Sequence, residues 1–185
     1  MKEIILASAS IRRKELLEKI TKKFKIIPSN IDEIYPPNLD LFSVPLYISN
    51  MKALDIYKDH PDSIVIGCDT AIVFNNTLIG KPKSKDNAKN MLLRFSGNYH
   101  YVITGATIYV NNQKYEINSI NKVHFKSITE QEIDEYLTYD EYKDKAGAYA
   151  IQGIAAKFIE KFEGEYDAIV GLPSKDIKSI LKNLI

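Results

Sequence analysis

The sequence predicts a mixed α/β fold, with strands and helices interspersed along a single domain that covers residues 1–185. Short apolar runs at Ile4–Ala7 and Ile64–Cys68 are typical of buried strands. After Ser84 the apolar residues follow the i, i+3, i+4, i+7 spacing of a helix. Two long segments, Tyr101–Val110 and Lys114–Lys126, are separated by a short polar turn and predict an antiparallel pair. The sheet should therefore be mixed.

The first third of the chain predicts strands that alternate with capped helices. A loop follows the first strand, and Ser10 is a suitable N-cap for a helix that runs to about Ile20. A short strand is expected at Phe24–Pro28. Ser43 is the expected N-cap of the next helix, which should end before Pro61.

The rest of the chain contains turn and cap signals that define its elements. Asn75-Asn76 predicts a hairpin turn, and Thr129–Glu132 is a capping box. The small residues of Asp144–Gly153 indicate a loop or a close-packed strand. We expect a strand at Ala168–Gly171 and a final helix from Pro173 onward.

Composition excludes several classes of protein. The 25 Lys and Arg residues nearly balance the 24 Asp and Glu residues, so no global charge favours nucleic acid or a membrane surface. The single cysteine, Cys68, excludes an intrachain disulfide and fits a reducing compartment. No segment resembles a signal peptide or a membrane span, so we expect a cytoplasmic protein.

Four common catalytic or cofactor motifs are missing from the sequence. Lys81 is followed by Pro82, which breaks the phosphate-loop pattern, and no G-x-G-x-x-G follows a strand. No G-x-S-x-G is present for a serine hydrolase. The three histidines are not spaced with Cys68 as zinc ligands, and we interpret both His100 and Cys68 as structural residues.

Polar residues at the ends of apolar segments are the candidate functional groups. The Ser8–Arg13 loop leads from a strand into a helix N-terminus, where N–H groups, hydroxyls and guanidinium groups suit phosphate oxygens. The alternative is an ordinary capped surface helix. Asp69 directly follows the run that ends at Cys68, and its carboxylate can hold Mg²⁺ or activate a water molecule. The alternative is an aspartate that merely ends a strand.

Further charged and polar residues could complete such a site. Asp32-Glu33, Lys52 and Lys81 lie near element ends and could serve a metal ion and phosphates, although each taken alone is more often a solvated charge. Within Asp144–Gly153, the small residues allow a ligand to approach the backbone, and Gln152 can read a base edge as donor and acceptor. The alternative is tight packing beneath a turn.

Eight segments together resemble the Maf family of nucleoside triphosphate pyrophosphatases, in family order across nearly the whole chain. They are LASASIRRKELL (Leu6–Leu17), IDE (Ile31–Glu33), KA (Lys52-Ala53), GCDTAIV (Gly67–Val73), GKP (Gly80–Pro82), SGNYHYVITG (Ser96–Gly105), DKAGAYAIQG (Asp144–Gly153) and VGLP (Val170–Pro173). Ile11 stands where the family usually has proline, which removes a fixed φ but no binding group.

The resemblance implies a fold, a reaction and a set of site residues. The fold would be an elongated mixed sheet flanked by helices, with two lobes and a cleft, similar to the inosine triphosphate pyrophosphatases. The reaction would split a nucleoside triphosphate into monophosphate and pyrophosphate with Mg²⁺ or Mn²⁺. Asp69 would be the catalytic carboxylate, as general base or as metal ligand, and Glu33 would help to hold the metal. The phosphates would be bound by Ser8, Arg13, Lys52 and Lys81.

The segments also resemble one subgroup of the family more than the other. Paired arginines, Asp69-Thr70 and the Lys145–Gly153 segment are similar to the subgroup for dTTP and UTP, with Arg12, Thr70 and Gln152 as the discriminating positions. The alternatives are a pyrophosphatase for 7-methyl-GTP or other modified nucleotides, and a nucleotide-binding regulator of septum formation. The family also implies a homodimer. The near-neutral charge, the scattered basic residues and the lack of a membrane span predict no nucleic-acid or membrane partner.

Overall fold

The computed structural model describes residues 2–184 of the chain. Its elements follow in the order β1 (Ile4–Leu6), α1 (Ile11–Glu18), β2 (Lys25–Ile26), α2 (Val44–Asp59), β3 (Ile64–Phe74), β4 (Thr77–Ile79), α3 (Lys85–Phe95), β5 (Tyr99–Val110), β6 (Gln113–Phe125), α4 (Glu130–Tyr136), η1 (Asp140–Tyr142), η2 (Ala146–Ala148), η3 (Ile154–Phe158), β7 (Ile159–Glu163), α5 (Tyr166–Val170) and α6 (Ser174–Leu184). Within the described residues, no helix is both long and apolar enough to cross a membrane.

The strands form one mixed sheet in the order β2-β1-β3-β5-β6-β7, with β4 paired to β3. β1 pairs in parallel with both β2 and β3. β3 and β4 are antiparallel, as are β6 and β7. β5 and β6 are neighbours joined by Asn111-Asn112, and so short a connection allows only an antiparallel pair. The predicted mixed sheet with flanking helices is confirmed; the predicted cleft stays a prediction.

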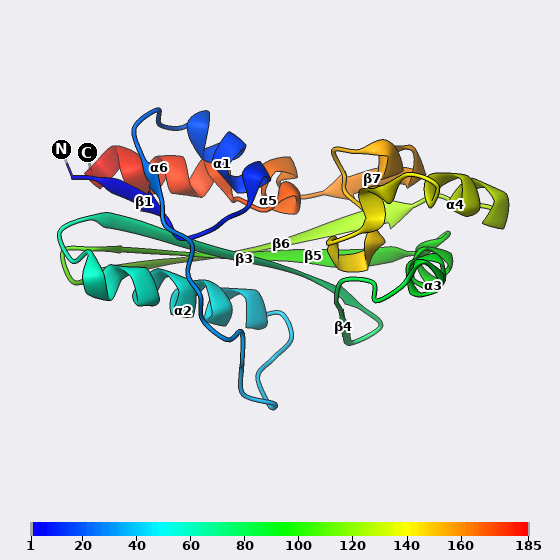
Figure 1. Cartoon of the computed structure of the whole chain (residues 1–185), viewed down its shortest axis with the longest axis horizontal. Coiled ribbons are helices and arrows are strands. Elements are labelled where there is room, and N and C mark those ends of the chain that lie inside the picture. Colours follow the sequence, from blue (N-terminus) through cyan, green and yellow to red (C-terminus); the bar gives the residue numbers. More distant parts are fainter. Residues whose placement is uncertain (1, 185) are drawn as a thin grey trace. The chain divides into compact units, whose positions relative to one another are not determined.

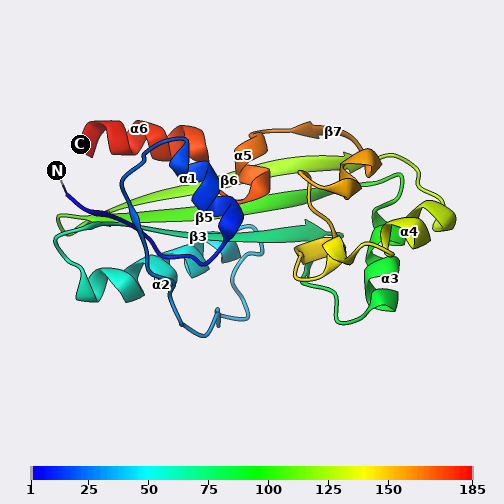
Figure 2. The same ribbon diagram turned by 45° about the horizontal axis from the view of Figure 1, so that its top comes forward.

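The chain forms two compact units, and β3, β5 and β6 each contribute residues to both. The first unit contains the residues up to Thr70, Ile103–Ser119 and the residues from Asp167 onward. The second contains Ala71–Val102 and Ile120–Tyr166. In the first unit, α2 covers one face of the strands, and α1 and α6 cover the other (Figures 1 and 2).

Each unit has an apolar interior that follows from the strand and helix patterns. In the first unit, Ile5 and Val65 of neighbouring strands pack with Ala53 of α2, and all three are fully buried. In the second, Phe95 stacks on His100 with ring centroids 4.2 Å apart, and Phe125 meets the same histidine edge-on. Burial of such aliphatic and aromatic side chains is the main favourable contribution to folding.

Several predicted turns and caps are confirmed. Ser10 accepts a hydrogen bond from the Arg13 N–H at the start of α1, and Ser84 does the same for Asn87 in α3. Thr129 and Glu132 form both hydrogen bonds of the capping box. Asn75 and Asn76 have φ values of 46° and 54°, as a hairpin turn with both central residues in the left-handed region requires.

Three predictions are wrong. Ala168–Gly171 is not a strand: it lies in and just after α5, because the N–H groups of Gly171 and Leu172 return to the Asp167 carbonyl. A run this short has no period that separates strand from helix. Ser43 precedes α2 but does not cap it through its side chain, since its hydroxyl donates to Asp40 instead.

The third wrong prediction is the position of Asp69 at a strand end. β3 continues through Asp69 to Phe74, because its later residues pair with β4 and because the polar side chains in its middle have partners.

Candidate active site

The loop after β1 presents the hydroxyl of Ser8 together with the guanidinium group of Arg13. Ser8 Oγ accepts one hydrogen bond from the Ser10 N–H (3.3 Å) and another from Arg13 Nη1 (3.1 Å). A hydroxyl has two acceptor lone pairs and one proton. Both lone pairs are therefore engaged, and the proton of the buried Ser8 is left to donate to an incoming oxygen.

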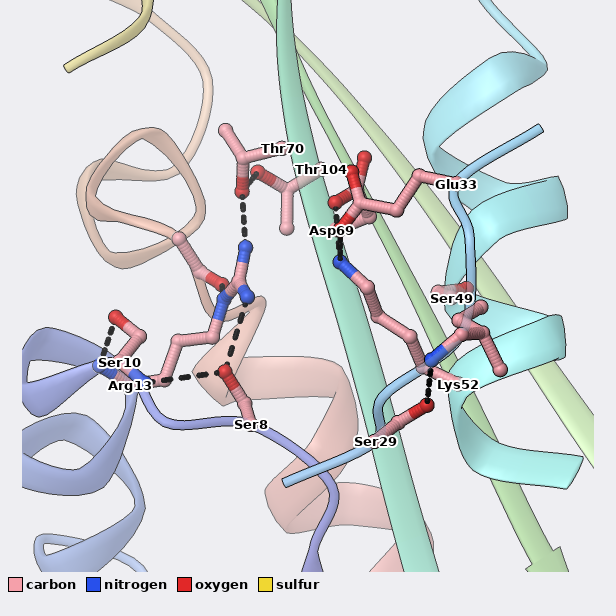
Figure 3. Close-up of polar contacts among 12 residues, drawn as sticks. Ser8, Ser10, Arg13, Ser29, Glu33, Ser49, Lys52, Asp69, Thr70 and Thr104 are labelled. Atoms are coloured by element: carbon pink, nitrogen blue, oxygen red, sulfur yellow. Dashed lines mark hydrogen bonds and ion pairs between the residues drawn. The ribbon is translucent and has the colours of Figure 1, made fainter. Parts of the chain in front are cut away.

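The Arg13 side chain is held by three different parts of the first unit (Figure 3). Besides Ser8, its Nε donates to the Gly171 carbonyl at 3.0 Å and its Nη2 donates to Thr70 Oγ1 at 3.2 Å. A guanidinium group has five N–H donors. These protein acceptors, all within the described residues, occupy three of them, so two remain for phosphate oxygens.

A second cluster is built around the ammonium group of Lys52 on α2. Its Nζ lies 2.6 Å from Glu33 Oε1 and 2.8 Å from Asp69 Oδ1, so one cation joins two carboxylates (Figure 3). The Lys52 and Asp69 side chains are only 13% and 16% exposed, whereas Glu33 is 55% exposed. The buried pair is therefore fixed, and Glu33 approaches it from the solvent side.

Burial determines the acidity of Asp69. Desolvation raises the pKa of the Asp69 carboxyl above its ordinary value, although the attraction of Lys52 and then of Arg13 acts in the opposite direction. A carboxylate with a raised pKa is a better proton acceptor. Lys52 contacts Oδ1, which leaves Oδ2 to accept a proton from a water molecule or to bind a cation.

The two clusters are on opposite faces of β3. Successive side chains of a strand point to opposite faces, so Asp69 is directed to α2 while Thr70 is directed to Arg13 (Figure 3). β1 pairs with β3 only as far as Ile66, and β4 pairs only from Ile72 onward. Asp69 and Thr70 thus lie in a part of β3 that neither β1 nor β4 covers.

The remaining candidate residues differ in how they are placed. Arg12 belongs to α1 beside this site, and partial burial, with the adjacent charge of Arg13, lowers the pKa of its guanidinium group. Arginine nonetheless stays protonated. Lys81 and Gln152 are exposed residues of the second unit. In the first unit the structure brings the other six candidates together as two clusters on the two faces of β3, one of Ser8, Arg13 and Thr70 and one of Glu33, Lys52 and Asp69.

The carboxylates of this site suit a divalent cation whose coordination is completed by substrate and water. Mg²⁺ is commonly held by one or two carboxylates together with substrate phosphates and water. Glu33 and Asp69 share one cationic partner, so their carboxylates are close enough to share a metal ion. Among the described residues there is no group of three or more His, Cys, Asp and Glu side chains that could form an all-protein site.

Two groups in this network were not predicted from the sequence. Thr104 of β5 lies 3.0 Å from Thr70 Oγ1, and the Gly171 carbonyl accepts from Arg13. Thr104 falls in the Ser96–Gly105 segment that carries part of the family resemblance, which is the only signal that could have pointed to it. Gly171 falls in the Val170–Pro173 segment of the same resemblance, but no sequence pattern shows that its carbonyl meets Arg13.

The fold is α/β and the candidate site carries donors suited to phosphate oxygens; comparison with known proteins identifies the family. The profile of the family described as Maf-like protein matches residues 3–184. The chain belongs to this family.

Named relatives cover essentially the whole chain. The dTTP/UTP pyrophosphatase of Clostridioides difficile is 41% identical over 97% of this chain and 93% of its own length. The dTTP/UTP pyrophosphatase of Clostridium botulinum strain Hall is 43% identical over 100% of this chain and 98% of its own. A HAM1 protein from Coxiella burnetii has a similar structure, with a TM-score of 0.56 at 12% identity over 99% of this chain and 100% of its own. That likeness confirms the expected fold.

Proposed function

We propose that the protein is a nucleoside triphosphate pyrophosphatase that hydrolyses dTTP and UTP to the monophosphate and pyrophosphate. The observation that carries the proposal is that adjacent residues of β3 engage two sets of charged groups: the largely buried carboxylate of Asp69 meets Lys52, and the Thr70 hydroxyl meets Arg13, which also contacts Ser8. Relatives named dTTP/UTP pyrophosphatase, more than 40% identical over nearly the full chain, support the choice of substrate.

The chemistry follows from what each side chain can donate or accept. Asp69 orients a water molecule and takes its proton while the water oxygen bonds to the α-phosphorus. The bond from the α-phosphorus to the bridging oxygen breaks, and pyrophosphate leaves. Arg13 and Ser8 donate to the phosphate oxygens, on which negative charge develops. Lys52 holds the Asp69 carboxylate in place through Oδ1.

Glu33 and Asp69 are the residues that would hold Mg²⁺ or Mn²⁺. When bound, such an ion supplies positive charge that polarises the phosphoryl group and neutralises the leaving pyrophosphate. We extend the proposal to Lys81 as a further phosphate ligand, and to Arg12, Thr70 and Gln152 as residues that select the pyrimidine. Action in the cytoplasm as a homodimer belongs to the same proposal, and sedimentation of the purified protein tests the dimer.

A substrate panel tests the reaction and separates it from its alternatives. Pyrophosphate release from dTTP and UTP should greatly exceed release from 7-methyl-GTP, and it should require Mg²⁺ or Mn²⁺. Comparable rates on purine nucleotides would contradict the pyrimidine assignment. Binding of nucleotide without any turnover would favour a regulator.

Asp69→Asn tests the role of the carboxylate. The substitution keeps the shape of the side chain but removes its basicity, so turnover should fall by about 10²-fold or more while nucleotide binding persists. Asp86→Asn, at the exposed N-terminal turn of α3, is the matched control and should retain turnover. Full activity of Asp69→Asn would rule out a catalytic role for Asp69.

A further inference from the structure

A row of hydroxyl groups extends from Arg13 into the interior of the first unit. Arg13 Nη2 lies 3.2 Å from Thr70 Oγ1, which lies 3.0 Å from Thr104 Oγ1. Thr104 Oγ1 is in turn 2.7 Å from the carbonyl oxygen of Ala168 in α5. Thr104 is fully buried, so water does not compete for its contact with the Ala168 carbonyl. The row joins the end of the guanidinium group to the backbone of a helix.

The direction of every hydrogen bond in this row is fixed by its two ends. The Ala168 carbonyl can only accept, so the Thr104 hydroxyl donates its single proton to it. Thr104 must then accept from Thr70, whose own proton is used in this bond. Thr70 oxygen is consequently free to accept from Arg13, which can only donate. Only one arrangement of the protons satisfies all four groups.

This arrangement fixes the plane of the guanidinium group. α5 contributes at both ends, since the Ala168 carbonyl terminates the row and the carbonyl of Gly171, just after the helix, accepts from Arg13 Nε. With three contacts in place, the two remaining N–H groups of Arg13 point in set directions. A guanidinium group whose paired N–H donors are already oriented, like the prongs of a fork, loses less conformational entropy on binding a phosphate than a free side chain does.

We propose that Thr104 is a positioning residue for triphosphate binding, which acts through Thr70 on Arg13. The inference rests on the proposed function, because it requires Arg13 to bind substrate phosphate. It also gives Thr70 a second role: its hydroxyl supports Arg13 by accepting from it.

A double-mutant cycle tests whether Thr104 acts through Arg13. The single variants Thr104→Val and Arg13→Lys and their combination are compared for affinity to the α,β-methylene analogue of dTTP, in the presence of Mg²⁺ and well below the melting temperature. Valine preserves the shape of threonine without its hydroxyl, so Thr104→Val alone should weaken binding about tenfold. With Arg13→Lys already present, it should weaken binding about twofold at most, because lysine has no fork to orient.

Two further variants separate positioning from general stability. Thr104→Ser keeps the hydroxyl and should restore affinity to within about threefold of the wild type. Thr107→Val is the matched control: Thr107 is also fully buried on β5, and its hydroxyl lies 2.8 Å from Ser49 Oγ, away from Arg13. Any effect of Thr107→Val on affinity should be the same with and without Arg13→Lys.

The outcomes are distinct. An equal loss from Thr104→Val in both Arg13 backgrounds would overturn the inference and leave Thr104 a structural residue. If Thr104→Val does not fold, Thr70→Val interrupts the same row at a less buried position and should show the same dependence on Arg13. A wild type that binds the analogue but does not hydrolyse dTTP would contradict the proposed function alone, and the cycle would still decide on Thr104. A wild type that does not bind the analogue would overturn both.

Discussion

At the residue scale, His100 lies in an enclosed, largely aromatic environment in the second unit. It is 1% exposed, its Nε2 lies 2.6 Å from the Tyr149 hydroxyl, and its ring stacks on Phe95. Its Nδ1 is buried with no hydrogen-bond partner among the described residues. Desolvation, with a smaller contribution from His124, lowers the pKa of His100 to about 3. The ring is therefore neutral in the folded protein at neutral pH.

We expect His100 to make folding stability depend on pH below its ordinary pKa of about 6.5. Between pH 6.5 and 3 the unfolded chain binds a proton that the folded chain does not, so stability falls as the pH falls, by up to about 1.4 kcal/mol per pH unit. Urea unfolding of the wild type and of His100→Gln at several pH values should show this pH dependence of stability. The variant should be less stable at pH 7, and the difference should shrink by about 2–3 kcal/mol at pH 4.5.

If the difference in free energy of unfolding between the wild type and His100→Gln did not change with pH, this account of His100 would be refuted. His60→Gln, at the end of α2, is the matched control for the loss of an imidazole at a less buried position.

Residue type alone was enough to nominate candidate residues but not to predict their contacts. Serine, arginine and carboxylate side chains next to apolar runs suggested Ser8, Arg13 and Asp69, and all three lie in the site network. Thr104 was not nominated, because a buried threonine in a long strand has the same sequence pattern whether or not it meets an arginine. Its contact spans 34 positions, and only the folded chain reveals it.

At the element scale, two glycines allow α2 to lie directly on the sheet. A Cβ at Gly67 would meet the Ser49 carbonyl and would come within 2.6 Å of the Ala53 nitrogen. A Cβ at Gly105 would meet the backbone of Leu46. Because α2 carries Lys52 and β3 carries Asp69, this close packing sets the distance between the two charged groups.

Gly67→Ala should therefore reduce both stability and turnover. The added methyl group has backbone on one side and must push α2 away, at a cost of about 1–3 kcal/mol in the free energy of unfolding. The same shift separates Lys52 from Asp69, so kcat should fall beyond what the loss of folded protein explains. Thermal unfolding and steady-state kinetics on the same samples give both quantities.

Gly80→Ala is the control, because a Cβ at that position meets nothing within 4 Å. Its free energy of unfolding should stay within about 0.5 kcal/mol of the wild type. If the two variants were equally stable, close packing of α2 would not explain Gly67.

The sequence predicted those turns and caps well that are formed by residues close together in the chain. The Asn75-Asn76 turn and the Thr129 capping box are formed by residues within four positions of one another. The length of β3 was underestimated because hydropathy changes at Asp69, whereas the strand is continued by pairing with β4. α5 was misread because it has only five residues, less than two helical turns.

At the scale of the whole molecule, the site network is assembled from distant parts of one discontinuous unit. Ser8, Glu33 and Asp69 come from its first segment, Thr104 from its second and Gly171 from its third. The formal charge of the chain is +1, so the proposed binding of a triphosphate has to rely on this local arrangement of charges and not on a global field. Folding of the unit and formation of the site are thus one event.

Substrate binding should consequently stabilise the protein against unfolding. At a free concentration 100 times its Kd, a ligand that binds only the folded state adds about 2.7 kcal/mol. For a chain of this size that corresponds to a rise of roughly 5–10 °C in Tm. Calorimetry with the α,β-methylene analogue of dTTP and Mg²⁺ measures the shift. Arg13→Lys should reduce it at the same ligand concentration, and an unchanged shift in that variant would argue against Arg13 as a phosphate ligand.

The alternation of β3 has a consequence for how the sequence can change. Asp69 and Thr70 serve opposite faces only because one is an odd and the other an even step from the paired residue Ile66. Insertion or deletion of a single residue between Ile66 and Asp69 would exchange their faces, and would turn the carboxylate to Arg13 and the hydroxyl to Lys52. Such a change should abolish turnover even where the fold survives, whereas loops elsewhere tolerate changes in length. The candidate site thus depends on the number of residues between Ile66 and Asp69 as much as on which residues they are.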